Sequence, residues 1–156
     1  MRQVAIVGGG KSWARAPFTD QSWEIWAHSS CCEGLARLRV DRWFDVHRPS
    51  VRAEPKKWSE RYQRWLTDPS EGRTAPVYVL DGCLAQPDVP TIENADIPNH
   101  VVLPWEEMQA WLVSRGSTDR EYVTSTGAWM LKLALFEGVD TIGIWGIDYE
   151  EHGEYL

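Results

Sequence analysis

The sequence has little cysteine, no long hydrophobic run and fewer positive than negative charges. Its three cysteines are an odd number and include an adjacent pair, which argues against a disulfide framework and against a regularly spaced zinc site. No apolar run approaches the roughly 18 residues that a membrane span needs. The start of the chain also lacks the basic-then-apolar pattern of a signal peptide. We therefore predict a cytoplasmic protein with no metal site and no membrane contact.

The net charge of −7 argues against general nucleic-acid binding. The charge is nevertheless uneven along the chain. Residues 37–64 hold nine basic and four acidic side chains, whereas residues 137–156 hold six acidic side chains and no lysine or arginine. A basic middle suits a site for a small anionic molecule. The alternative is that these segments are two solvated faces of opposite sign.

Short apolar segments alternate with segments of helical character along the 156 residues. The predicted strands lie at residues 3–7, 23–27, 43–47, 76–80, 101–103 and 141–147. The predicted helices lie at residues 55–67, 104–114 and 126–137. Strands that are apolar along their length and separated by helices are typical of a parallel sheet covered on both faces. We predict a single α/β domain over residues 1–156, a three-layer sandwich with a mostly parallel Rossmann-like sheet.

Three glycines follow the first predicted strand. Gly8, Gly9 and Gly10 would let the backbone approach a phosphate closely, or they form a plain tight turn. Their spacing matches neither the dinucleotide fingerprint nor the P-loop. The hydroxyl of Ser12 could join a phosphate site. Trp13 could stack on a base or a sugar, although packing in the core is the alternative for a tryptophan.

A second candidate anion site lies at the start of the last predicted helix. Ser125, Thr126 and Gly127 would supply hydroxyls and free amides to a ligand. Capping of the helix is the alternative, and it is compatible with binding.

Polar side chains also follow three other predicted strands. Ligands of parallel α/β sheets bind beyond the carboxyl ends of the strands, and His28, His47, Arg48 and Asp148 all lie at such ends. Either histidine could move a proton near neutral pH, and Arg48 could pair with a phosphate. We predict His47 and Arg48 as catalytic residues, and His28 and Asp148 as ligand-binding residues. Structural hydrogen bonding is the alternative for each of them.

Two segments together resemble a known group of proteins. Val4 to Ser12 resembles the strand-and-glycine start of the sialyltransferase-like, motility-accessory-factor-like and hydroxymethylpterin-pyrophosphokinase-like Rossmann-type proteins, many of which have proline where this chain has Lys11. Thr124 to Asp148 resembles their second signature, a Ser-Ser-Gly helix start, a helix that ends in glycine and a strand that ends in Gly-Val/Ile-Asp. The chain is most similar to small phage-encoded proteins that carry both segments.

The resemblance implies a nucleotide held between the glycine loop and the helix start at Ser125. The group spans sugar transfer and pyrophosphoryl transfer, so the resemblance leaves the reaction open. In the sialyltransferases a catalytic histidine lies beyond the second signature, and no residue here is matched to it. We therefore expect a protein that binds a small anionic ligand, a nucleotide or a nucleotide sugar, with transferase activity as the first hypothesis.

Two alternatives remain from the sequence. One is a non-catalytic phage protein that binds or sequesters a nucleotide-like ligand in the host cytoplasm. The other is a structural or assembly partner with a vestigial site. Ten tryptophans in a chain of this length leave room for a homodimer face.

Overall fold

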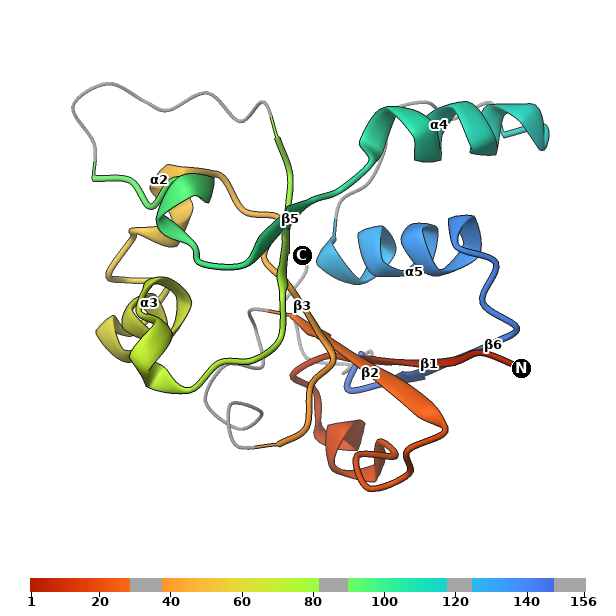
Figure 1. The fold of residues 1–156 in the computed structure, drawn as a ribbon, viewed down its shortest axis with the longest axis horizontal. Coiled ribbons are helices and arrows are strands. Elements are labelled where there is room, and N and C mark those ends of the chain that lie inside the picture. Colours follow the sequence, from red (N-terminus) through yellow and green to blue (C-terminus); the bar gives the residue numbers. More distant parts are fainter. Residues whose placement is uncertain (29–37, 82–89, 118–124, 148–156) are drawn as a thin grey trace.

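A six-stranded parallel sheet forms the centre of the molecule (Figure 1). The computed structural model describes residues 1–28, 38–81, 90–117 and 125–147. Every pair of neighbouring strands is parallel, and the order across the sheet is β5-β4-β3-β2-β1-β6. The strands are β1 (Gln3–Val7), β2 (Trp23–His28), β3 (Arg42–Phe44), β4 (Val77–Val79), β5 (His100–Val102) and β6 (Thr141–Trp145).

Helices cover both faces of this sheet. One face packs against α4 (Trp105–Ser114) and α5 (Thr126–Phe136), and the other packs against α3 (Glu60–Thr67) and the short helix η1 (Lys11–Arg15). The remaining short elements are α2 (Pro49–Arg52), η3 (Pro69–Glu71) and η4 (Asn94–Asp96). This arrangement confirms the predicted α/β sandwich with a Rossmann-like sheet.

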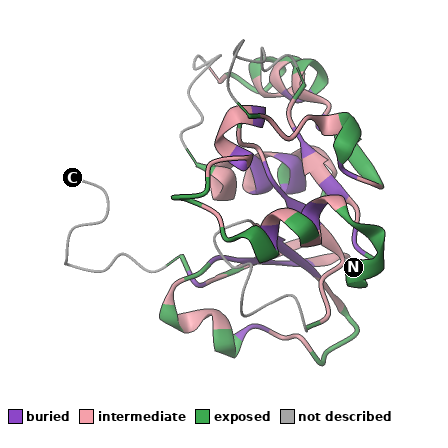
Figure 2. Cartoon of the chain, turned by 90° about the vertical axis from the view of Figure 1, so that its left-hand side faces the viewer, coloured by how far each residue is buried: buried purple, intermediate pink, exposed green. Residues whose placement is uncertain are grey.

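Burial along β1 explains why the strands read as continuously apolar. Val4 and Ile6 point into the cluster under α4 and α5, whereas Ala5 and Val7 point into the opposite cluster. All four side chains are at most 1% exposed. Side chains of a strand alternate between faces, so a strand buried on both faces has no polar positions. Figure 2 shows the same pattern, with burial concentrated inside the sandwich.

Three predicted boundaries differ from the structure by two residues or more. The strand predicted at 43–47 ends at Phe44, and Pro49 begins α2 rather than only ending a strand. The helix predicted at 55–67 begins at Glu60, because the Ser59 hydroxyl caps it by accepting a hydrogen bond from the Tyr62 amide at 3.2 Å. The strand predicted at 141–147 ends at Trp145, because Gly146 has a φ of 66°.

Charged residues at the amino end of the sheet pair with one another. Arg2 contacts Glu24 and Glu137 at 2.6 and 2.7 Å, and Arg42 contacts Glu137 at 2.7 Å. Ion pairs between alternating positive and negative side chains therefore join the elements at this edge of the sheet. No helix among the described residues has both the length and the apolar character required to cross a membrane.

The two loops that follow β1 and β6 touch through their backbones. The Gly8 amide donates to the Trp145 carbonyl at 2.8 Å, and the Gly10 amide donates to the Gly146 carbonyl at 2.7 Å. A Cβ atom on Gly8 would overlap the carbonyl oxygen of Gly146, and the reverse also holds. Both positions therefore require glycine if the loops are to approach this closely.

Gly146→Ala and Gly138→Ala form a matched pair that tests this contact. Both glycines have a positive φ, 66° and 68°, so alanine costs about 1–2 kcal/mol at either position. Only Gly146 has a neighbouring backbone in the way, whereas nothing lies within 4 Å at Gly138. We expect Gly146→Ala to lose about 1–3 kcal/mol more than Gly138→Ala in urea unfolding, because of overpacking. Equal losses would show that the loops can separate without penalty.

Candidate functional site

The carboxyl ends of the strands bring several of the predicted residues to one edge of the sheet. Gly8 follows β1, His28 ends β2, Asp45 and His47 follow β3, and Gly146 follows β6. The chain adds strands in one direction from β1 to β5 and then returns to the other side of β1 to form β6. β1 and β6 are therefore neighbours at the point where the winding reverses, which is where α/β sheets bind ligands.

Within the glycine loop, most of the predicted ligand-binding groups are engaged with the protein. Gly8 is buried, and its amide and that of Gly10 bond to the loop after β6. The Ser12 hydroxyl accepts a hydrogen bond from the Gly146 amide at 2.7 Å. Gly9 is exposed, and its amide has no acceptor among the described residues. The loop thus has a structural role at three positions and presents Gly9 outward.

The start of α5 lies beside the glycine loop. Ser125 accepts a hydrogen bond from the Ala128 amide at 3.2 Å, so the predicted capping is confirmed. A Cβ on Gly127 would lie 3.0 Å from Cδ1 of Ile147, and one on Gly8 would lie 2.9 Å from Cγ1 of the same side chain. The two glycine motifs therefore both lie against the side chain of Ile147. Within the described parts of the chain, the amides of Thr126 and Gly127 have no acceptor.

Trp13 packs against the core cluster that contains Ala5 and Val7. Its ring meets Phe18 edge to face, with the ring centroids 6.1 Å apart. Part of its surface remains accessible. Stacking on a ligand stays a prediction for Trp13, and packing against the core already gives it a structural role.

A buried carboxylate lies at the end of β3. Asp45 is 0% exposed. Its Oδ1 lies 2.9 Å from Nδ1 of His47 and accepts a hydrogen bond from the His47 amide at 3.1 Å. Its Oδ2 accepts a hydrogen bond from the Tyr62 hydroxyl at 2.7 Å, and that hydroxyl in turn accepts one from Nε1 of Trp43 at 3.2 Å.

The charge of Asp45 is balanced by a buried arginine. Nε of Arg52 lies 3.3 Å from Oδ1 of Asp45, and its Nη2 donates to the Asp45 carbonyl at 2.9 Å. Nη1 of Arg52 donates to Oδ1 of Asn94 at 2.7 Å. Arg52 is 1% exposed. Since a buried ion needs both a counter-charge and hydrogen bonds, these contacts explain how the carboxylate is tolerated.

The protonation of Asp45 follows from these contacts. Burial acts to raise the pKa of the carboxyl group, but the hydrogen bond and charge of His47, the charge of Arg52 and the Tyr62 hydrogen bond outweigh it. The pKa of Asp45 is therefore below its ordinary value, and the group is ionised near neutral pH.

His47 connects this buried network to the surface. Its side chain is 29% exposed, and its ring meets Trp58 edge to face with the centroids 5.1 Å apart. When Nδ1 carries the proton that bonds to Asp45, Nε2 of the neutral ring carries the lone pair. Arg48, the next residue, is exposed at the start of α2, and its guanidinium has no partner among the described residues.

His28 lies on the neighbouring strand and is electrostatically coupled to this network. The pKa of His28 is lowered to about 4, mainly by burial and also by the charge of His47, while the charge of Asp45 opposes the shift. The ring is therefore neutral near pH 7. Of the predicted site residues, Asp148 lies outside the described residues.

Sequence reasoning missed the centre of the network. Asp45, Arg52 and Tyr62 were not among the predicted site residues. The Asp-Val-His spacing at a strand end was the available signal, because residues two apart in extended backbone lie on the same side. Nothing local distinguishes Arg52 from the eight other basic residues of the segment 37–64.

Comparison of the chain with protein-family models, with curated proteins and with solved structures found no match.

Tyr62→Phe tests how far the network depends on the Tyr62 hydroxyl. The change leaves Asp45 Oδ2 and Trp43 Nε1 buried without this partner. We expect a loss of about 2–4 kcal/mol in urea unfolding, because each orphaned buried group costs about 1–3 kcal/mol. Tyr78→Phe is the control: this half-buried hydroxyl has no hydrogen bond among the described residues, so the loss should stay below about 0.5 kcal/mol. Similar losses of stability in both variants would contradict a stabilising role for the Tyr62 hydroxyl.

The low pKa of His28 predicts sensitivity to mild acid. In the unfolded chain, His28 is protonated below its ordinary pKa of 6.5, whereas in the folded protein it is protonated only when the pH falls to about 4. The unfolded state therefore binds more protons in this window, and stability falls as pH decreases from 6.5 to about 4. Asp45 contributes only at lower pH, because its depressed pKa lies below 3.8. In urea unfolding at pH 7, 5.5 and 4.5, His28→Gln should flatten this decline, and an unchanged slope would contradict the assignment.

Proposed function

We propose that the protein binds a nucleotide or nucleotide sugar at the carboxyl edge of its sheet and transfers a glycosyl or pyrophosphoryl group. The observation that carries the proposal is the meeting of the glycine loop, the α5 start and the Asp45–His47 network at this one edge. Phosphate groups favour helix starts with unused amides, because the amides and the helix dipole both attract negative charge. Thr126 and Gly127 have such amides among the described residues, beside the glycine loop.

The distance between the two parts of the edge suits a nucleotide. β1 and β3 are separated by one strand, so the ends of these strands lie about 10 Å apart at the usual strand spacing. A ligand with phosphates near Gly9 and Gly127 would therefore extend its other end toward His28 and His47. Trp13 and Asp148 remain predicted contacts of this ligand.

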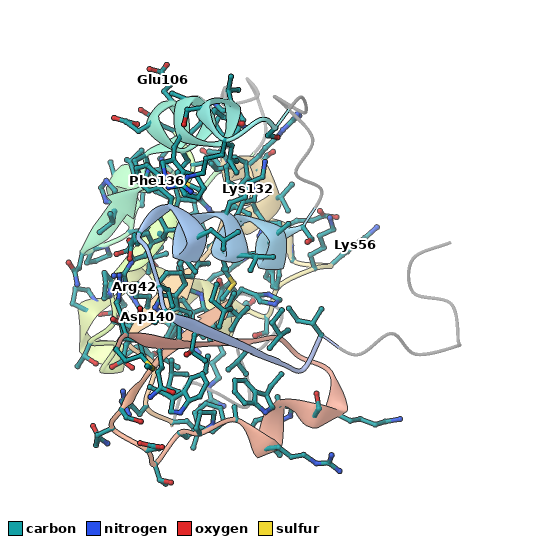
Figure 3. The ribbon with its side chains drawn as sticks, turned by 90° about the vertical axis from the view of Figure 1, so that its right-hand side faces the viewer. Arg42, Lys56, Glu106, Lys132, Phe136 and Asp140 are labelled. Carbon is teal, nitrogen blue, oxygen red and sulfur yellow. The ribbon has the colours of Figure 1, made fainter. Side chains whose placement is uncertain are left out.

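Exposed cations adjoin His47 and its neighbour Trp58 in the sequence. Arg48 follows it directly, and Lys56 and Lys57 precede Trp58, whose ring contacts the His47 ring. Figure 3 shows Lys56 projecting beyond one edge of the molecule, whereas Arg42 and Asp140 lie at the opposite edge. A positive border of this kind attracts an anionic ligand and stabilises a phosphate leaving group. It supports the assignment of Arg48 to charge neutralisation.

The proposal is tested by offering the purified protein nucleoside triphosphates and nucleotide sugars and measuring the shift in melting temperature. We expect at least one compound to raise the melting temperature and to be recovered changed. A compound that binds and is recovered unchanged, also with acceptors present, favours the non-catalytic alternative. No shift with any compound favours the structural alternative and overturns the proposal.

Gly9→Val locates the ligand within the structure. Gly9 is exposed and makes no hydrogen bond among the described residues, so a branched side chain there should leave the fold intact while blocking a phosphate. We expect the ligand-induced shift to disappear in Gly9→Val and to persist in Ala95→Val, which places the same side chain at an exposed position on η4. A retained shift in Gly9→Val would mean that the loop is only a turn.

A further inference from the structure

Asp45 is completely buried, whereas its hydrogen-bond partner His47 is partly exposed. A purely structural network would be complete with Asp45, Arg52 and Tyr62, all of which are nearly inaccessible to solvent. The network instead includes a half-exposed histidine ring, bonded through Nδ1 to the inaccessible carboxylate at 2.9 Å. Nδ1 of the imidazole is thus held by the protein, and the partly exposed ring lies at the carboxyl edge of the sheet, where the ligand is proposed to bind.

We propose that Asp45 is a positioning residue that holds His47 with its proton on Nδ1, and that Nε2 of His47 accepts the proton of an acceptor hydroxyl during group transfer from a phosphate-linked donor. This inference rests on the proposed function and deepens it by naming the acceptor class and the proton acceptor.

The proposed step transfers one proton to His47 and one group to the oxygen of the acceptor. The acceptor O–H bond breaks, its proton goes to Nε2, and the oxygen forms a bond to the electrophilic atom of the transferred group. The bond from that atom to the donor phosphate oxygen breaks, and its electron pair leaves with the phosphate. Exposed Arg48 neutralises the charge that develops on this phosphate. The proton on His47 then passes to solvent as the product leaves.

The groups that face His47 support this role. Asp45 stabilises the imidazolium that forms, and Arg52 and Tyr62 keep the Asp45 carboxylate ionised, so the proton stays on the histidine. His28, from the neighbouring strand, stays neutral by burial and adds no positive charge that would oppose protonation of His47. Trp58 packs against the ring and restricts its orientation.

The first test is the proton position on His47, which needs no ligand. In nitrogen NMR of the imidazole rings, we expect the neutral His47 ring to carry its proton on Nδ1. A proton on Nε2 in the full chain would overturn the inference, whatever the protein binds.

The second test is donor hydrolysis, in which water replaces the acceptor hydroxyl. Nucleoside triphosphates and nucleotide sugars serve as probes, and phosphorus NMR shows which bond is broken. We expect His47→Asn and Asp45→Asn each to lower the rate about 100-fold or more, in the range of general base catalysis, and the double variant to lose little beyond either change. The rise of the rate with pH should disappear in His47→Asn.

His47→Asn keeps the Asp45–Arg52 pair, so it remains informative if Asp45→Asn fails to fold. The matched control is His100→Asn, which changes an exposed histidine on β5 and should keep the full rate. If a donor raises the melting temperature of the wild-type protein and of His47→Asn, but His47→Asn hydrolyses it at the wild-type rate, the inference fails and the proposed function stands. If no donor binds or reacts, both fail.

Discussion

A carboxylate buried at the end of β3 is the constraint on which this edge of the molecule depends. Asp45 has no contact with solvent, so each of its oxygens must be satisfied by the protein. Meeting that requirement joins elements that are distant in sequence, since Tyr62 comes from α3 and Arg52 from α2. Arg52 in turn binds Asn94, which ties the segment before β5 to the same centre. The position of His47 follows from this arrangement.

The glycine loop has a structural role in addition to its predicted role in ligand binding. Gly8 and Gly146 allow two loops to meet backbone to backbone, which locks β6 beside β1. That pairing creates the reversal of winding at which parallel sheets accept ligands. Gly8 therefore fixes the position of the loop that presents Gly9, whose backbone is exposed at the same edge.

The sequence predicts the fold well and the site only in part, for physical reasons. Strands buried on both faces leave a local pattern in the sequence, and so does the end of α5, where Gly138 has a positive φ. The contacts of Asp45 leave none, because they depend on which distant residues the topology brings together. The predicted end of this strand is wrong for a related reason. Val46 is apolar enough to continue β3, but the hydrogen bond from the His47 amide to the Asp45 carboxylate turns the chain away from the sheet.

Two pairs of neighbouring residues of the same type lie in different environments, which gives the members of each pair different roles. His28 and His47 end adjacent strands, yet burial keeps His28 neutral, whereas His47 has a carboxylate at 2.9 Å and access to solvent. Arg48 and Arg52 lie one helical turn apart, yet Arg52 forms a buried ion pair with Asp45 and Arg48 is exposed. Divergent environments of paired titratable groups are typical of sites that move protons. The same edge thus separates its fixed charges from the groups that can meet a ligand, which favours chemistry over simple sequestration.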